Sequence, residues 1–68
     1  MKMWIARDRW GGLGLFEYMP HEDGGYWYDG TEDRESYEVL LPSNQFPEVT
    51  FDNSPMEVEL KLVNDVQG

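Results

Sequence analysis

The last part of the chain alternates strictly between charged and apolar residues, in the order Glu57, Val58, Glu59, Leu60, Lys61, Leu62. Successive side chains of a β-strand point to opposite faces of a sheet, so a period of two is typical of a strand with one buried face. A helix would instead place apolar residues three or four positions apart. We therefore predict a strand over residues 57–63, with Val58, Leu60 and Leu62 facing the core.

Glycine and proline divide the rest of the chain into short extended segments, and no stretch of helical length shows an apolar spacing of three to four residues. Further strands are expected at residues 2–7, 13–19, 26–28 and 49–51. Residues 37–41 fit either a strand or a helical turn, which Pro42 would end. Turns and loops are expected at residues 8–12, 21–25, 29–30, 43–47 and 53–55. Phe46 precedes a proline, which favours an extended backbone there.

These segments predict a mainly β fold that forms one small domain over residues 1–68. We expect a small twisted antiparallel sheet or a partly open barrel of four to six short strands, with room for one short helical turn. A domain of this size buries only about 60% of the surface of its unfolded chain, so its stability should be about 5 kcal/mol or less. The residues expected to face the core are Met3, Ile5, Leu13, Leu15, Val39, Leu41, Val49, Phe51, Val58, Leu60 and Leu62.

The charges of this chain are unevenly distributed. Its formal net charge is −9, and Arg34 is the only cation between Glu17 and Glu59. A strongly negative surface repels nucleic acids and membranes with anionic lipids, so direct binding to either is not expected. The chain has no cysteine and no apolar stretch as long as a signal peptide or a membrane span requires, which favours a reducing cytoplasm.

Residues that could support catalysis or bind a metal lack the partners that such chemistry needs. His21 is the only histidine and lies in a predicted loop beside two carboxylates, whereas a general base or a zinc site needs partners at defined geometry. The glycines of residues 11–14 lack the spacing of a phosphate-binding loop, and the acidic run 29–35 lacks that of a calcium loop. We therefore expect no enzymatic activity, no cofactor and no bound metal.

The acidic and aromatic residues predict a binding surface for a protein with a basic groove. Carboxylates on short strands and loops can imitate the charge of a nucleic-acid backbone, and Trp and Tyr are frequent at the energetic centres of protein interfaces. The predicted acidic residues of this surface are Glu22, Asp23, Asp29, Glu32, Asp33, Glu35 and Glu38. The predicted aromatic residues are Trp10, Tyr26, Trp27 and Tyr28.

Several segments of the chain also occur together in a known group of proteins. They are residues 4–8, the Leu15-Phe16 strand before Pro20, residues 46–51 and residues 57–62. This set resembles short uncharacterised proteins encoded by phages and integrated mobile elements of gut anaerobic bacteria. The resemblance leaves residues 21–38 unmatched and transfers no functional residue. It implies a cytoplasmic accessory protein in a bacterial host cell, and inhibitors of host defence nucleases, anti-CRISPR proteins among them, would fit the predicted acidic surface.

Other interpretations of the same residues remain open. The charges could serve solubility alone, since a net charge far from zero keeps small domains apart. The aromatic residues could form a second cluster that covers the open face of the sheet. A final strand at the edge of the sheet could pair two copies in a homodimer or assembly, with its charged residues protecting it from aggregation. A binding module, for example for carbohydrate, could use exposed Trp and Tyr residues as stacking surfaces.

Overall fold

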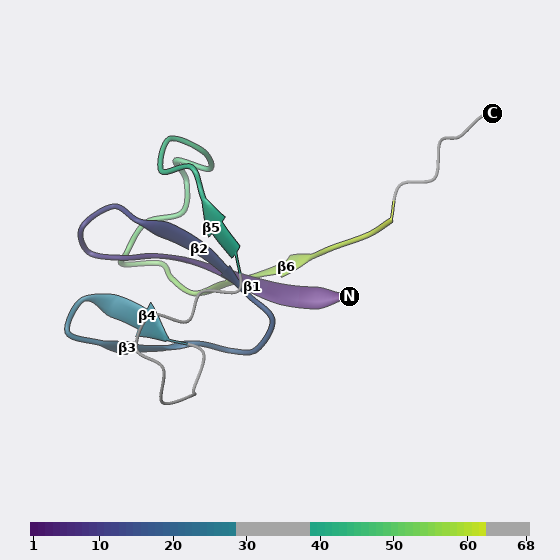
Figure 1. Ribbon diagram of the computed structural model, residues 1–68, viewed down its shortest axis with the longest axis horizontal. Helices are drawn as coiled ribbons and strands as arrows, with labels where there is room; N and C mark the ends of the chain where they lie inside the picture. The colour runs from purple at the N-terminus through teal and green to yellow at the C-terminus, as the bar shows by residue number, and fades with distance from the viewer. Residues whose placement is uncertain (29–38, 63–68) are drawn as a thin grey trace.

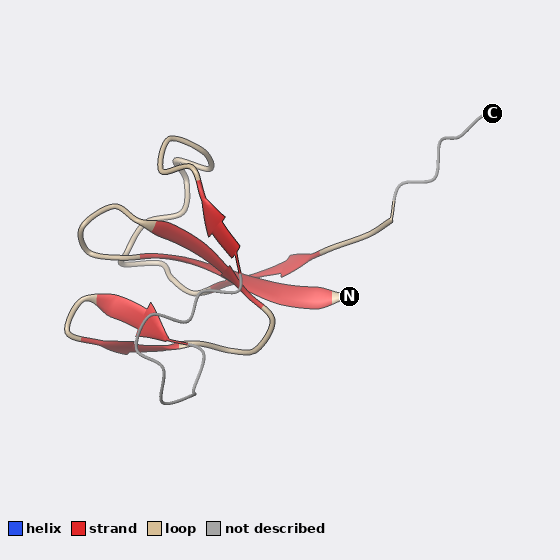
Figure 2. Ribbon diagram, viewed as in Figure 1, coloured by secondary structure: helices blue, strands red, loops and turns tan. Residues whose placement is uncertain are grey.

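The structure is a computed structural model and describes residues 1–28 and 39–62. Its strands run in chain order β1 (Lys2–Arg7), β2 (Leu13–Phe16), β3 (His21–Asp23), β4 (Tyr26–Tyr28), β5 (Val39–Leu41) and β6 (Met56–Glu59) (Figure 1). Loops and turns join the strands, and the described residues contain no helix, hence none that could cross a membrane (Figure 2). The prediction of a mainly β fold is confirmed, without the short helical turn that it allowed in this part of the chain.

Four strands form one antiparallel sheet in the order β5-β2-β1-β6, and β3 pairs with β4 in a separate two-stranded sheet. Strand β1 lies inside the larger sheet, where Ile5 is opposite Leu15 of β2 on one side and Met56 of β6 on the other. The predicted hairpin of the first two strands is confirmed, although β2 ends at Phe16 instead of residue 19. Over the described residues the larger sheet has two edges, β5 and β6, so it is not a closed barrel.

The larger sheet has apolar side chains on both of its faces. On one of them, which we call the groove face, the buried residues Ile5 and Leu13 pack against Val49 from the loop between β5 and β6. Partly buried residues from three strands surround this cluster, namely Leu15, Leu41 and Val58. The cluster thus contains or contacts residues of all four strands of the sheet, together with one loop residue.

The opposite face, which we call the hairpin face, is covered by the β3–β4 hairpin. Trp27 of β4 is only 9% exposed and packs against Ala6 and Phe16, both fully buried. Its indole N–H donates a hydrogen bond to the carbonyl oxygen of Arg7 at 3.0 Å, and Trp4 and Phe51 pack around the cluster. The interpretation of the aromatic residues as a second cluster on the sheet is therefore correct for Trp27.

Residues 21–23 form strand β3, so the loop predicted there is wrong. They pair with β4 through a two-residue turn that places His21 opposite Tyr28. Gly24 and Gly25 have φ values of +66° and +91°. A type I′ hairpin turn, which matches the twist of the strands, needs positive φ at both positions, and glycine adopts it without steric cost. The glycine pair is therefore a hairpin turn between two three-residue strands.

The strand predicted at residues 49–51 is also wrong, because local hydrogen bonds replace a sheet ladder there. The backbone N–H of Thr50 donates to Oδ1 of Asn53 at 2.8 Å, and the backbone N–H of Asn53 donates to Oγ1 of Thr50 at 3.3 Å. Oγ of Ser54 donates to the carbonyl oxygen of Thr50 at 2.6 Å. Thr, Asn and Ser side chains compete in this way with secondary structure for backbone groups. The segment is consequently a folded loop.

Hydrogen bonds from Arg7 hold this loop against the sheet. Its guanidinium group has five N–H donors in a planar fork, and each of them points at a backbone carbonyl group. The acceptors are the carbonyl oxygens of Gly11, Ser43, Gln45, Phe46 and Val49. One side chain of β1 therefore joins the β1–β2 turn to most of the loop between β5 and β6.

Phe46 does not have the extended backbone that was predicted from the following proline. Its φ is +51°, in the left-handed region. In this conformation its carbonyl oxygen accepts hydrogen bonds from the Arg7 guanidinium at 3.0 Å and from the N–H of Val49 at 2.9 Å. These two bonds offset the cost of a conformation that residues with a Cβ rarely adopt.

The C-terminal strand is shorter than predicted. Strand β6 ends at Glu59, and its apolar side chains divide into half-buried Val58 and the exposed Leu60 and Leu62, which are 54% and 94% accessible. The prediction for Leu60 and Leu62 is wrong because the β6 ladder with β1 runs only from Met56 to Glu59, opposite Ile5 to Lys2, so these two side chains lie beyond the paired part of the sheet. The N–H of Leu60 donates to the Met1 carbonyl oxygen at 2.7 Å, where this ladder ends.

The remaining core predictions are partly correct. Met3, Ile5, Leu13 and Val49 are buried as predicted, whereas Leu15, Leu41 and Phe51 are only half-buried. Val39 is exposed, which contradicts its predicted place in the core, because it lies on β5 at the edge of the sheet.

Candidate functional site

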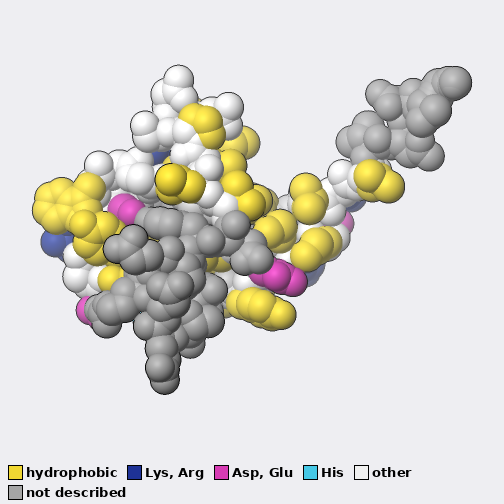
Figure 3. Space-filling model, viewed as in Figure 1, with side chains coloured by type: hydrophobic (Ala, Val, Ile, Leu, Met, Phe, Trp, Pro, Cys, Tyr) yellow, Lys and Arg dark blue, Asp and Glu magenta, His cyan; other side chains and the backbone are white. Residues whose placement is uncertain are grey.

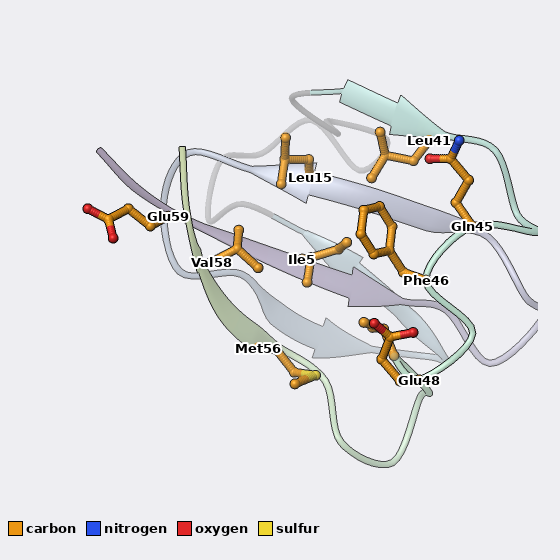
Figure 4. Close-up of a pocket in the computed structure, with 10 residues that line it drawn as sticks. Ile5, Leu15, Leu41, Gln45, Phe46, Glu48, Met56, Val58 and Glu59 are labelled. Atoms are coloured by element: carbon orange, nitrogen blue, oxygen red, sulfur yellow. The ribbon is translucent and has the colours of Figure 1, made fainter. Parts of the chain in front are cut away.

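The groove face of the larger sheet is only partly covered and contains a groove of about 550 Å³. Figure 4 shows Leu15, Ile5 and Val58 side by side across β2, β1 and β6, with Leu41 and the ring of Phe46 on the far side of the hollow. The complete lining is Ile5, Leu15, Leu41, Gln45, Phe46, Glu48, Val49, Met56, Val58 and Glu59. A mostly apolar concave surface with a few polar groups is the usual form of a binding site.

The loop between β5 and β6 is the described segment that covers the groove face. It covers only one end of that face, so the groove stays open. Val49 fills that end beside Ile5 and Leu13, and Arg7 holds the loop in place. Phe46 and Met56 stand at the margin and remain 46% and 38% exposed. The hairpin face has a whole hairpin over it, so the two faces of the sheet differ sharply in how well they are covered.

Exposed apolar side chains continue from the groove along the C-terminal segment. In Figure 3, hydrophobic side chains follow β6 and the extension beyond it. Leu60 and Leu62 share the side of the strand that carries Val58, because residues two positions apart lie on the same face. Contiguous apolar surface of this kind marks an interaction site more often than scattered single residues do.

Carboxylates supply the charge around the groove. Glu48 lies at one end, and Glu59 lies at the other with its carboxylate turned away from the hollow (Figure 4). The lining contains no cation, and Arg7, which holds the adjoining loop, directs its N–H groups to backbone carbonyls. With a net charge of −9 for the whole chain, the groove favours a ligand that carries positive charge beside apolar groups.

Two of the seven predicted acidic site residues can be located. Glu22 and Asp23 lie exposed on β3. Oε2 of Glu22 accepts a hydrogen bond from the N–H of Gly25 at 2.8 Å, so this carboxylate also fixes the hairpin turn. The other five, Asp29, Glu32, Asp33, Glu35 and Glu38, lie outside the described residues. The acidic face as a whole stays a prediction.

The four predicted aromatic residues divide into accessible and covered ones. Trp10 is 69% exposed and Tyr26 is 44% exposed, and their turns adjoin, since the N–H of Arg9 donates to the Gly25 carbonyl oxygen at 2.8 Å. Trp27 belongs to the core of the hairpin face. The last of the four, Tyr28, is half-buried with its ring tilted against His21 at 5.9 Å. Trp10 and Tyr26 are thus the two that a partner could reach readily.

The described residues do not assemble a recognisable site for metal chemistry. No group of three or more His, Cys, Asp or Glu side chains within residues 1–28 and 39–62 is placed to hold an ion. His21 lies exposed at the start of β3. The expectation that the chain is not an enzyme stays a prediction.

No protein-family model, curated protein or solved structure matches this chain. The resemblance to proteins of phages and mobile elements therefore stays a prediction, as does a location in the bacterial cytoplasm. The groove and the charges around it carry the functional argument.

Four residues of the groove were not expected from the sequence. Gln45, Phe46, Glu48 and Met56 were assigned to turns or left unassigned, because none of them belongs to an alternating segment. Met56 takes its position from its pairing with Ile5, and the others take theirs from the loop that Arg7 binds. An arginine at the end of a mostly apolar strand was the signal for that loop. Arg7 was counted only as one of the cations of the chain.

Proposed function

We propose that this chain is a non-enzymatic, acidic protein-interaction domain. Its groove would bind a segment of another protein in which apolar side chains stand next to Lys or Arg. The observation that carries the proposal is the groove that the described residues leave open on one face of the sheet, whereas the β3–β4 hairpin packs against the other face. Within the described residues, this groove brings apolar side chains from four strands and one loop to a single concave surface.

The chemistry of the groove supports a partner of this kind. The apolar lining would remove leucine-sized side chains from water, each contributing about 1.5–3 kcal/mol before the costs of association. Glu48 would attract a flanking cation, and the net negative charge would raise the rate of encounter. A purely hydrophobic partner would gain nothing from these carboxylates, and an acidic one would be repelled.

A variant of Met56 should test the groove directly. The probe is a short peptide of alternating leucine and lysine, and the Met56→Lys change places a cation in the lining beside the apolar residues. We expect the dissociation constant to rise roughly tenfold, because about 1.4 kcal/mol of burial and charge attraction is lost. Isothermal titration calorimetry at constant salt measures the difference.

Leu40→Lys is the matched control for this experiment. It changes the net charge equally, but Leu40 lies exposed on β5 and is not part of the groove lining. Its affinity for the peptide should stay close to that of the wild type. Equal weakening by both variants would contradict the proposal, as would equal binding of a peptide that alternates serine and lysine.

A second version of the proposal concerns the identity of the basic partner. Glu22 and Asp23 lie exposed on the same hairpin as the accessible Tyr26, close to Trp10, and this favours a charged and aromatic surface at that end of the molecule. Under this version the seven predicted carboxylates imitate a nucleic-acid backbone and block a host nucleic-acid-binding protein. Such an inhibitor would use the hairpin end rather than the groove.

A further inference from the structure

Strand β6 is an edge of the larger sheet, and its free side can be identified from the hydrogen bonds on the other side. Leu60 both donates to the Met1 carbonyl oxygen and accepts from the Met1 amino group, at 2.7 and 3.1 Å. Backbone groups of successive residues in an antiparallel strand point to opposite sides. The N–H and C=O groups of Glu59 and Lys61 therefore point away from β1, towards the free edge.

The side chains along this edge are apolar on one face of the strand and charged on the other. Val58 lies on the groove face of β6, and continued alternation beyond Glu59 would place Leu60 and Leu62, both largely exposed, on the same side. Glu59 and Lys61 lie on the opposite face and carry opposite charges. The segment also projects from the body of the molecule (Figure 1), so a second strand could approach it without obstruction by the described part of the chain.

We propose that two copies of this chain pair through residues 58–62 as antiparallel edge strands. Leu60 would lie opposite Leu60 of the second copy, at the twofold axis. Glu59 would lie opposite Lys61 of the second copy, and Lys61 opposite its Glu59, giving two symmetric ion pairs. Val58 would lie opposite Leu62 of the second copy, so that every pair joins either two apolar side chains or two opposite charges.

Charge selects this register over its neighbours. A pairing centred on Glu59 would also keep apolar residues together, but it would place Glu59 opposite Glu59. A pairing centred on Val58 would place Glu57 opposite Glu59 twice. Like charges directly opposite each other destabilise a strand pair. The register centred on Leu60 avoids both arrangements within residues 58–62.

The backbone fits the same register. The N–H and C=O groups of Glu59 and Lys61 point to the free edge, so in this register these two residues form the hydrogen-bonded pairs. Leu60 forms a non-hydrogen-bonded pair, in which the side chains approach most closely. The pairing would remove an exposed sheet edge and would cover Leu60 and Leu62. Leu62 would then lie beside Val58 of the second copy at the margin of its groove, leaving the part around Ile5 and Leu15 open.

The oligomeric state of charge variants tests this pairing. Lys61→Glu converts both Glu59–Lys61 pairs to like charges and should raise the dissociation constant of the dimer roughly tenfold or more. The double change Glu59→Lys with Lys61→Glu restores opposite charges in the proposed register and has the composition and net charge of the wild type. It should dimerise within about threefold of the wild type. Sedimentation equilibrium at about 0.15 M salt, where screening acts beyond ~8 Å, measures each constant.

The double variant also identifies the register. In a pairing centred on Glu59 it would bring like charges together at every charged pair and abolish the dimer. Glu48→Lys reverses one charge, as Lys61→Glu does, but at a site away from the edge, and should not weaken the dimer. A wild type that stays monomeric at about 1 mM would overturn the proposal, and so would a double variant no better than Lys61→Glu. The oligomeric state is read without the groove-binding peptide, so each proposal can fail alone.

Discussion

Replacing Arg7 with methionine should lower the free energy of unfolding by about 3 kcal/mol, the larger part of what a domain of this size possesses. The guanidinium bonds five backbone carbonyls from the β1–β2 turn and the loop between β5 and β6. Bonds to a charged donor contribute ~1.5–3 kcal/mol singly, and those at the exposed end of the side chain contribute less. Urea denaturation followed by tryptophan fluorescence measures the loss.

Arg9→Met provides the matched control, since it removes the same charge two residues away. Arg9 is exposed, and its guanidinium carbon stands 5.1 Å from the centroid of the Phe51 ring. Loss of such a contact at an exposed site costs about 0.5–1 kcal/mol. Arg7→Lys should lie close to Arg7→Met, because an ammonium group has three donors and no planar fork. If Arg7→Met cost no more than Arg9→Met, the loop would not depend on Arg7.

Truncating Trp27 to alanine should cost about 3–5 kcal/mol and leave much of the chain unfolded at 25 °C. The side chain joins the hairpin to Ala6 and Phe16, and its removal would open a large cavity on the hairpin face. Trp27→Phe keeps most of this area and loses the indole bond to the Arg7 carbonyl, which should cost about 1 kcal/mol more than the change in packing. Thermal denaturation by circular dichroism distinguishes the two variants.

Trp10→Ala is the control for an accessible tryptophan and should change the stability by less than about 0.5 kcal/mol. The comparison also decides how binding data are interpreted. A loss of partner binding in Trp27→Ala would follow from unfolding, whereas a loss in Trp10→Ala would indicate a contact. Stability of Trp27→Ala equal to that of Trp10→Ala would contradict the placement of Trp27 in the core.

The strands themselves were the part of the fold that the sequence predicted best. Residues 2–7 alternate in side-chain type, and residues 26–28 are all aromatic. Both segments are strands, as predicted. Strand β3 was missed because its residues, His21 to Asp23, are all polar and exposed, so no apolar period marks them. The Gly24–Gly25 pair was the signal that could have identified the hairpin.

The groove could not be predicted for a different reason. Alternation identified Ile5, Leu15 and Val58 as residues of one face, but it says nothing about what covers that face. Coverage depends on a loop whose path follows from hydrogen bonds between distant residues, such as Arg7 and Ser43, 36 positions apart. Period and turn signals are local, so the open groove became visible only in three dimensions.

The difference between the two faces suggests how so small a domain can both fold and bind. The hairpin face buries Ala6 and Phe16 completely, and the hairpin residue Trp27 covers them. The groove face keeps Phe46 and Met56 at its margin, available to a partner. A partner that fills the groove would therefore stabilise the fold by mass action, and the stabilisation would grow with its concentration.

Methyl resonances on the two faces of the sheet provide the most direct test of an open groove beside a closed face. The leucine–lysine peptide is titrated into the labelled protein, and shifts are followed for Ile5, Leu15, Leu41 and Val58 in the groove and for the buried methyl of Ala6 on the other face. We predict saturable shifts at the four groove residues and none at Ala6. Shifts that are equal on both faces, or absent at high peptide concentration, would contradict the assignment of the groove as the binding site.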